Sequence, residues 1–554
     1  MPIKPYIPED DVLKYEFKVS GANNGLDSLL KDATINFELN KIPSAKFSFV
    51  ASNIEVNKDE LLPSDSLKEN AEIEFIISIG KEKKTLFKGK IKSVEKTQNN
   101  DSITTKIECK DLALAMTFPL EEQETNEQTF KDKLTKIVGK LKIGSGLSGA
   151  WESEKITHNT STVPWDFVVS YLDSVGVLLA VKNGELSGVD YIKAPPTEKY
   201  VAENGINVFS FSGKNDESKK IKKVSIEAWD PSSQSLKKSE SEQEAPNPII
   251  KTIRLNDNNL VEGTIKLMAD AILKKSLHTA ISGKVTTFGN LTAGIGDYII
   301  LNKVNDSIDG KKILISGELH TIENGCWRTE YTLGLESEQV FGNTATKNIS
   351  NPQAQIGQTN LVSGLQIGIV MQIEDDPKKE FRIKVKIPAL AENGSGVWAR
   401  LATLNASSSM GSFFIPNVND EVLLGCFGNN PDTPVILGGL YSSAIKPPYE
   451  IKKENYIKAF VTKEGTKIEM DDEKKQIELS TKKGNKIFIS DDKKGITLED
   501  ENKNKIIMNA DGILIESAKD IILKAKGDLK IDAVNIKAKA SANIELKGSM
   551  IKLN

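Results

Sequence analysis

The chain has 554 residues, which is too long for one ordinary hydrophobic core and predicts three or four structural units. Lysine and arginine total 73 against 77 aspartate and glutamate, and a net charge of -4 excludes a strong overall field for nucleic acid or an anionic membrane. The three cysteines, Cys109, Cys326 and Cys426, are far apart and form no CxxC pair, which excludes a disulfide framework and a zinc knuckle.

Residues 1–347 form the first expected unit, a β-rich domain with a few helices. Alternating apolar residues and turn signals predict strands over 35–50, 73–79, 86–94 and 103–109. Helical spacing predicts helices over 130–141, 165–172 and 260–277, the last capped by Asn258 or Asn259. The stretch 230–247 is polar, Ser-rich and charged, so we expect an exposed, mobile loop.

A polar linker over 348–360 leads to a second expected unit, residues 361–447. Its five strand candidates are 365–373, 381–387, 396–402, 421–427 and 434–438. Five short strands in so few residues are typical of a small Greek-key barrel of the oligonucleotide-binding (OB) type. A connector over 448–460 follows, and composition then changes, because Pro447 and Pro448 are the last prolines of the chain.

The tail, residues 461–554, contains an internal repeat. Residues 465–472 recur at 484–492 and, more weakly, at 503–509, a step of nineteen residues, and the runs 476–479 and 495–498 lie between them with the same step. After Gly512 the period shortens to about eight residues, with short apolar runs separated by polar turns. A fixed period of this kind predicts a stacked β architecture.

Such short strands cannot form a globular core in one chain, because each offers only one or two apolar side chains and leaves its edges unpaired. Threefold closure solves both problems, so we predict an intertwined trimeric β-helix or β-prism. The side chains expected in its trimer core are Ile468, Ile487, Ile515, Leu523, Ile531, Ile544 and Ile551.

Motifs in the first unit and in the barrel, together with the order of the three parts, follow one known family. In the barrel these are residues 368–370, 382–388, 397–402, 414–422, 428–432, 434–442 and 446–448, and Asn419 replaces the glycine of a Gly-Asp-Glu-Val turn. In the first unit they are residues 40–45, 86–91, 164–167, 175–178, 293–297, 317–320 and 325–327. The chain resembles the VgrG-type spike proteins of type VI secretion systems and, more closely, those of extracellular contractile injection systems related to phage tails.

This resemblance implies partners. The first unit is expected to form a hub that adapts a hexameric, Hcp-like inner tube to a trimeric needle, with baseplate proteins as further partners. The needle is expected to pierce the target membrane mechanically and to deliver cargo effectors. A PAAR-type protein is expected to cap the blunt end at Met550, Leu553 and Asn554. Neither a signal peptide nor a membrane helix of ~18 apolar residues is evident, so we expect cytoplasmic assembly into a membrane-anchored or released particle.

No catalytic, cofactor or metal site is expected. His158, His278 and His320 are widely separated and lie in no HxH or HExxH context. The acidic pairs at 471–472 and 491–492 lack the glycine-rich spacing of calcium-bound β-rolls and are expected in solvated turns. We therefore predict a structural protein and not an enzyme.

Nucleic acid is not an expected partner of the barrel. Residues 361–446 contain 8 acidic and 7 basic side chains, a balance that does not favour a phosphate backbone. The barrel aromatics, expected to fill its core, are Phe381, Trp398, Phe413, Phe414 and Phe427. Two alternatives to a passive spike stay open: an effector-carrying type VI spike, and a trimeric β-helical adhesin or glycan binder.

Overall fold

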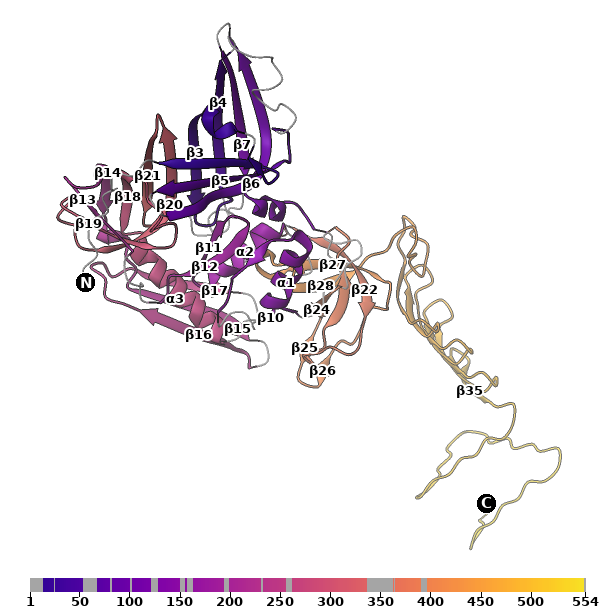
Figure 1. The fold of residues 1–554 in the computed structure, drawn as a ribbon. Coiled ribbons are helices and arrows are strands. Elements are labelled where there is room, and N and C mark those ends of the chain that lie inside the picture. Colours follow the sequence, from indigo (N-terminus) through magenta and orange to yellow (C-terminus); the bar gives the residue numbers. More distant parts are fainter. Residues whose placement is uncertain are drawn as a thin grey trace. The chain divides into compact units, whose positions relative to one another are not determined.

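The computed structural model describes residues 13–552 except 24, 53–66, 80–81, 100–101, 121–127, 150–154, 157–162, 194–198, 231–232, 256–261, 336–361, 363 and 390–395. The chain divides into two compact units, Met1–Tyr441 and Ser442–Asn554 (Figure 1). The prediction of a mainly β, multidomain fold is confirmed. The expected linker at 348–360, the caps Asn258 and Asn259, and Leu553 and Asn554 at the tip lie outside the described residues.

A large antiparallel sheet organises the first unit. Its strand order is β14-β18-β21-β20-β3-β4-β7-β6-β5-β1-β2, and β13 and β19 join through β20. These strands are β1 (Lys14–Val19), β2 (Ala22–Asn23), β3 (Leu30–Glu38), β4 (Ser44–Ser52), β5 (Glu72–Ile79), β6 (Glu82–Gln98), β7 (Ser102–Lys110), β13 (Tyr200–Glu203), β14 (Val208–Asn215), β18 (Ile281–Phe288), β19 (Tyr298–Asn302), β20 (Lys312–Glu323) and β21 (Cys326–Leu333). The run 35–50, predicted as one stretch, is two strands because Asn40 takes a left-handed φ of 61° in the turn between them.

The three predicted helices are confirmed as α1 (Phe130–Leu141), α2 (Pro164–Ser174) and α3 (Glu262–His278). A reciprocal capping box between Thr129 and Asp132 begins α1, which satisfies backbone N–H groups that have no partner within the helix. Helices α2 and α3 are joined by a buried ion pair, with Lys275 Nζ 2.6 Å from Asp173 Oδ1. Two small sheets lie nearby, β8 (Gln128–Thr129) with β10 (Lys155–Ile156), and β9 (Gly144–Ser145) with β11 (Val177–Lys182) and β12 (Glu185–Asp190).

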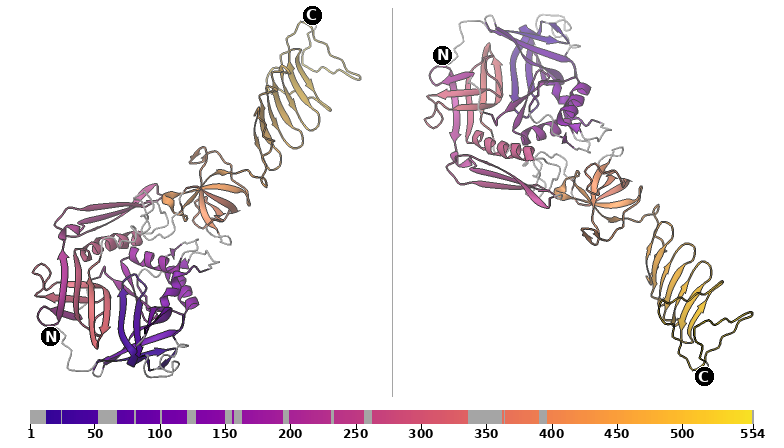
Figure 2. Two further views of the ribbon diagram at one scale, coloured as in Figure 1. Left: turned by 90° about the horizontal axis from the view of Figure 1, so that it is seen from above. Right: turned by 90° about the horizontal axis from the view of Figure 1, so that it is seen from below.

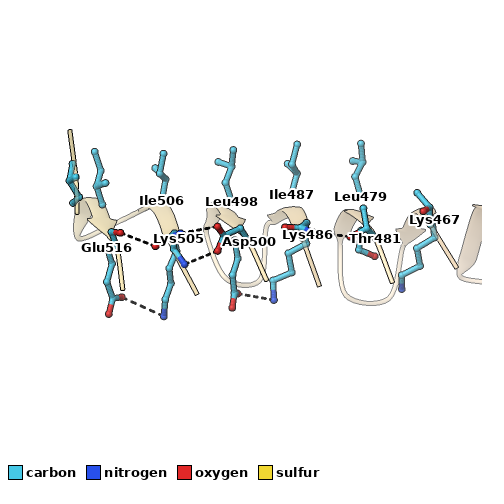
Figure 3. Close-up of a pocket in the computed structure, with 18 of the residues that line it drawn as sticks. Lys467, Leu479, Thr481, Lys486, Ile487, Leu498, Asp500, Lys505, Ile506 and Glu516 are labelled. Carbon is cyan, nitrogen blue, oxygen red and sulfur yellow. Dashed lines mark hydrogen bonds and ion pairs between the residues drawn. The ribbon is translucent and has the colours of Figure 1, made fainter. Parts of the chain in front are cut away.

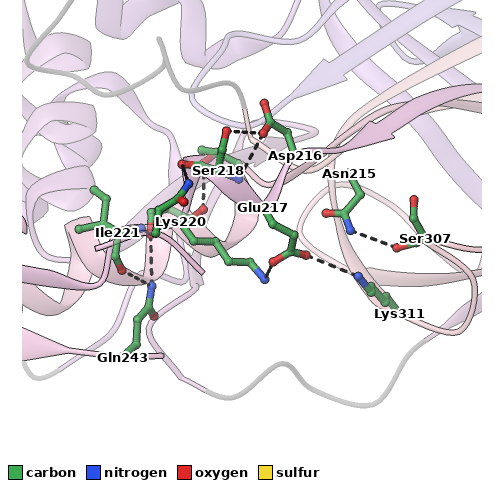
Figure 4. Close-up of polar contacts among 12 residues, drawn as sticks. Asn215, Asp216, Glu217, Ser218, Lys220, Ile221, Gln243, Ser307 and Lys311 are labelled. Atoms are coloured by element: carbon green, nitrogen blue, oxygen red, sulfur yellow. Dashed lines mark hydrogen bonds and ion pairs between the residues drawn. The ribbon is translucent and has the colours of Figure 1, made fainter. Parts of the chain in front are cut away.

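The expectation of a loop at 230–247 is wrong over residues 235–242, which form a strand. Strand β16 (Ser235–Glu242) pairs with β15 (Lys223–Asp230), which also pairs with β17 (Ile250–Leu255). Polar side chains of this stretch have partners on α3 and in the segment before β15: Ser241 Oγ donates to Asp270 Oδ1 at 2.5 Å on α3. The Gln243 amide donates to the Ile221 carbonyl at 2.8 Å (Figure 4). A polar stretch can thus be ordered here because polar groups such as the Ser241 hydroxyl find partners within the fold.

The predicted five-stranded barrel is confirmed. It closes in the order β22-β23-β24-β28-β27, from β22 (Gln366–Gln372), β23 (Ile383–Lys386), β24 (Val397–Leu401), β27 (Glu421–Cys426) and β28 (Pro434–Gly439). The short hairpin β25 (Ala406–Ser407) and β26 (Met410–Gly411) lies between β24 and β27. The core is aliphatic and includes Val370, Val385, Ala399, Val422 and Leu424.

The expectation that aromatic residues fill the barrel core is wrong. Trp398 is only half-buried, because it alternates along β24 with the core residues Val397 and Ala399. Phe381 is 93% exposed, Phe413 86% and Phe414 65%, and Phe427 is also exposed. The reason is the position of these residues: all four lie outside the barrel strands, and nine or so aliphatic side chains already fill the small interior.

The second unit contains a seven-stranded antiparallel sheet whose strands follow one another in sequence order. They are β29 (Ile457–Val461), β30 (Lys467–Asp471), β31 (Gln476–Ser480), β32 (Lys486–Ser490), β33 (Gly495–Glu499), β34 (Lys505–Asn509) and β35 (Gly512–Glu516). Figure 2 shows these strands stacked like rungs, so the backbone hydrogen bonds between them run along the direction in which the stack grows.

Candidate interchain interface

The nineteen-residue repeat corresponds to one strand-turn-strand-turn unit of this sheet. At the same point of each repeat, Thr481 N–H donates to the Asn485 carbonyl at 2.9 Å and Asp500 N–H donates to the Asn504 carbonyl at 3.1 Å. The turns need one residue of left-handed φ, which is Gly484 at 98° in the first and Lys503 at 72° in the second. Identical turns keep successive strands in register, so side chains nineteen residues apart lie on the same face.

One face of the sheet is apolar. Directly opposite one another across successive strands are Ile468, Leu479, Ile487, Leu498, Ile506 and Ile515. A second column on the same face, two residues along each strand, contains Met470, Ile477, Ile489, Ile496, Met508 and Ile513. The first column lines an open groove of ≈ 830 Å³, and Figure 3 shows its side chains projecting together to one side of the strands.

These apolar side chains are not buried within one chain. Ile468 is 44% exposed, Ile487 41% and Leu498 37%. Two adjacent columns of six apolar side chains, most of them exposed, form a contiguous apolar surface, which is rare on a monomer and is typical of an interface. Burying the exposed part of each Ile or Leu side chain would contribute about 1 kcal/mol, so two columns provide a large driving force for association.

On the opposite face the columns at the strand ends are polar and their charges are paired, whereas the middle column also contains Phe488, Ile507 and Leu514. Lys486 Nζ lies 3.0 Å from Glu499 Oε2, and Lys505 Nζ lies 3.5 Å from Glu516 Oε2 (Figure 3). The hydrogen bond from Lys486, followed by its charge, lowers the pKa of Glu499 below its ordinary value. The charged strand ends are suited to water, so this face is the more polar of the two.

Two carboxylates lie directly opposite one another at the start of this polar face. Glu469 and Glu478 are cross-strand partners, and Lys467 Nζ neutralises both, at 2.7 Å from Glu469 Oε2 and 3.5 Å from Glu478 Oε1. Burial opposes ionisation of Glu469, but hydrogen bonds from Lys467 and from the Tyr449 hydroxyl (2.6 Å) outweigh it and hold the pKa of this carboxyl below its ordinary value. The pairing removes a like-charge repulsion that would otherwise disturb the register.

The segment after β35 has a different character. Residues 517–552 contain no strand, and the described backbone N–H and C=O groups from 521 to 552 form no backbone hydrogen bond within the chain. The same segment carries alternating apolar side chains, including Ile521, Leu523, Leu529 and Ile531, each more than half exposed. An extended backbone with unpaired ladder groups and exposed apolar side chains is suited to pairing with strands from outside the chain.

The predicted trimer-core residues fall into two groups. Ile468, Ile487 and Ile515 lie in the first apolar column, whereas Leu523, Ile531, Ile544 and Ile551 lie in the extended segment. The structure adds Leu479, Leu498 and Ile506 to the column, and the step of nineteen between Leu479 and Leu498 was the signal for them. Which of the seven face a trimer axis stays a prediction. Met550 is exposed, and its role at a tip also stays a prediction.

The other candidate chemistry is dispersed. His320 is buried beside Thr329, with Nδ1 2.9 Å from Oγ1, His278 packs against the Tyr191 and Tyr298 rings, and His158 lies outside the described residues. Asp471 accepts the N–H groups of Glu473 and Lys474 within its turn. Among the residues that the structure describes, no cluster of three His, Cys, Asp or Glu side chains could hold a metal ion. No described helix is both long and apolar enough to cross a bilayer.

Comparison with known families matches each part of the chain. Residues 9–324 match the Alg8 N-terminal domain. The chain belongs to the Alg8 N-terminal domain family. Residues 366–441 match the type VI secretion system/phage-baseplate injector OB domain, and residues 476–554 match the phage baseplate V C-terminal trimerisation domain. The chain therefore carries a trimerisation domain in the region where its apolar face and extended segment lie.

Two curated proteins match a short region of this chain. The chain is 33% identical over 72 residues to the type VI secretion system spike protein VgrG5 of Pseudomonas aeruginosa, and 34% identical over 74 residues to VgrG3 of Vibrio cholerae. These matches cover 13% of this chain, and 9% and 7% of the two relatives. Together with the family models, they confirm the resemblance to VgrG-like spike proteins.

The fold has a counterpart over nearly the whole chain. A chain of the lidded Francisella PdpA-VgrG complex aligns with 92% of this chain and 80% of its own length, at a TM-score of 0.53 and 11% sequence identity. At this identity the similarity concerns the fold.

Proposed function

We propose that this chain is the structural spike of a contractile injection apparatus, in which three copies join a hub domain to a trimeric needle. The observation that carries the proposal is the second unit: a sheet with one bare apolar face, followed by a segment whose backbone has no partners within the chain. Three copies related by one axis would bury the apolar faces against each other and pair the extended segments between chains.

The proposal includes the partners that a spike needs. The large β domain docks beneath a hexameric, Hcp-like inner tube within a baseplate, and a PAAR-type protein caps the far end of the needle. The whole assembly belongs to a particle that is anchored or released, and it acts by mechanical puncture and cargo delivery without catalysing a reaction. The VgrG relatives and the baseplate family models support this assignment.

The mass of the purified chain in solution tests the proposal. We expect size-exclusion chromatography with light scattering to give three times the chain mass. Two variants of one strand sharpen the test: Leu498→Asp places a carboxylate on the apolar face, whereas Thr497→Asp places it on the opposite face. Three desolvated carboxylates near one axis are strongly unfavourable, so Leu498→Asp is expected to dissociate the trimer and Thr497→Asp to leave it intact.

A folded monomer of the unsubstituted chain would disprove the proposal. The two variants carry the same new carboxylate and differ only in the face of the sheet on which it lies. Equal effects of the two substitutions would therefore show that the apolar face is not the interchain surface.

A further inference from the structure

One loop of the barrel holds a bare aromatic side chain in a strained backbone conformation. Phe381 has a φ of 58°, a region that bulky residues avoid, and its ring is 93% exposed. The strain is supported by Asp376, whose Oδ2 accepts the N–H groups of Glu380 (2.8 Å) and Arg382 (3.2 Å). Strain that the surroundings maintain at an exposed aromatic residue indicates a contact surface.

A second feature of the barrel is an uncharged arm. Residues 403–418 contain no Asp, Glu, Lys or Arg, although 27% of the whole chain is charged. The arm is ordered by hydrogen bonds across its base, including Thr403 Oγ1 to the Ser412 carbonyl at 3.2 Å, and Figure 1 shows its β25–β26 hairpin projecting from the barrel. Leu404 is 93% exposed and Phe413 86%, so the arm presents apolar side chains that water does not favour.

The topology places the loop and the arm at the same end of the barrel. Strands β22 and β23 are antiparallel, as are β23 and β24, so the loops after β22 and after β24 leave the barrel at one end. Strand β28 is parallel to β24, so the chain also leaves the barrel at this end, at Leu440, on its way to the trimerisation domain. The opposite end carries the β23–β24 and β27–β28 connections.

We propose that this barrel end, with Phe381, Leu404 and Phe413 as its anchors, packs against the barrel of another copy of the chain. The inference rests on the proposed trimer and adds a second interchain contact outside the needle. The trimerisation domain (476–554) follows this end in the sequence, with β29 and β30 between them. Joining three chains there holds the three barrels at high effective concentration, so even a modest apolar contact forms. An arm without Lys or Arg is poorly suited to a phosphate backbone, which favours a protein partner.

Thiol accessibility in the purified full-length chain tests the contact. In a background with Cys326→Ser and Cys426→Ser the one remaining native thiol, Cys109, is buried. A Phe413→Cys thiol then reports on the proposed surface, and an Ala389→Cys thiol reports on the exposed opposite end of the barrel. Each is labelled with a maleimide reagent in the trimer and in the Leu498→Asp monomer, or in the Ile506→Asp monomer if the first aggregates. Phe413 is exposed in the single chain, so its substitution does not disturb the barrel core.

We expect the Phe413→Cys thiol to react at least about tenfold more slowly in the trimer than in the monomer, because its exposure requires local opening of the contact. The Ala389→Cys thiol is expected to react equally fast in both. Equal rates for Phe413→Cys, protection that persists in the monomer, or protection that nuclease treatment abolishes would each overturn the inference. A trimer with a reactive Phe413→Cys thiol overturns only this contact, whereas a monomeric unsubstituted chain overturns the proposed function as well.

Discussion

At the residue scale, the seven-stranded sheet β29 to β35, called the needle sheet below, contains one turn position where the repeat departs from its own sequence pattern. The left-handed turn residue is Gly465 in the first copy, Gly484 in the second and Lys503 in the third, and all three have positive φ. A non-glycine residue in this region costs about 1 kcal/mol relative to glycine. The only ion pair of Lys503 in the described chain, 3.8 Å to Glu499 on an exposed surface, contributes little against this cost.

Replacing Lys503 by glycine is therefore expected to stabilise the second unit, because it removes a strain of about 1 kcal/mol per chain. The added conformational entropy that glycine gives the unfolded chain offsets part of this gain. The midpoint of thermal unfolding, measured by circular dichroism, should rise. Glu501→Gly in the same turn is the control. Glu501 does not have a positive φ, so glycine at this position relieves no strain and should lower the stability of the second unit. A lower midpoint for Lys503→Gly than for the unsubstituted chain would contradict the assignment of strain.

At the element scale, the loop between β22 and β23 is built around one ion pair. The Arg382 guanidinium is almost fully buried and lies 2.6 Å from Asp376 through Nη2, and three backbone N–H groups also donate to Asp376. Burial opposes ionisation of Asp376, but these hydrogen bonds outweigh it and lower its pKa to about 2. A lowered pKa means that the folded barrel favours the carboxylate form.

The stability that this pair contributes is fully present above the ordinary pKa of Asp, about 4, and is lost as the pH falls towards 2. Asp376→Asn removes the charge that compensates buried Arg382 and is expected to destabilise the barrel by about 3 kcal/mol. Hydrogen exchange of barrel peptides at pH 7 measures this loss, and urea unfolding between pH 5 and pH 2.5 should become less pH-dependent in the variant. An unchanged pH profile would mean that Asp376 is not the titrating group.

Element by element, the sequence was most informative where one pattern persisted. The capped helix α1, the five barrel strands and the repeat of the needle sheet were predictable because the period of apolar residues matched the element. The hairpin strand β16 was not, because its alternation involves serine and charged residues whose partners, on α3, are distant in sequence. The exposed position of Phe413 was not predictable either, because residue type indicates hydrophobicity but not whether the partner is the same chain.

At the scale of the whole molecule, the interface residues could be predicted only as a periodicity, since the backbone of residues 521–552 pairs with no strand of the described chain. Ile531→Asp should therefore abolish the ordered pairing of this segment, whereas Lys530→Asp should preserve it, because adjacent side chains of an extended backbone point to opposite sides. Hydrogen exchange of peptides from 521–552 in the full-length trimer is the measurement. Slow exchange is expected for Lys530→Asp and fast exchange for Ile531→Asp, and the reverse order would place the opposite side chains at the axis.

The stacked ladder of β29 to β35 also responds differently to force in its two directions. Its hydrogen bonds run along the stack, so a load that pushes on the stack compresses every N–H···O contact together, and the close-packed rungs resist it collectively. A load that pulls on the stack instead opens one pair of strands at a time, beginning at an end. The needle sheet therefore resists compression along the stack, but its strands can separate one pair at a time under tension. A spike that stays intact when driven forward would lose its strand pairing most readily when it is drawn back.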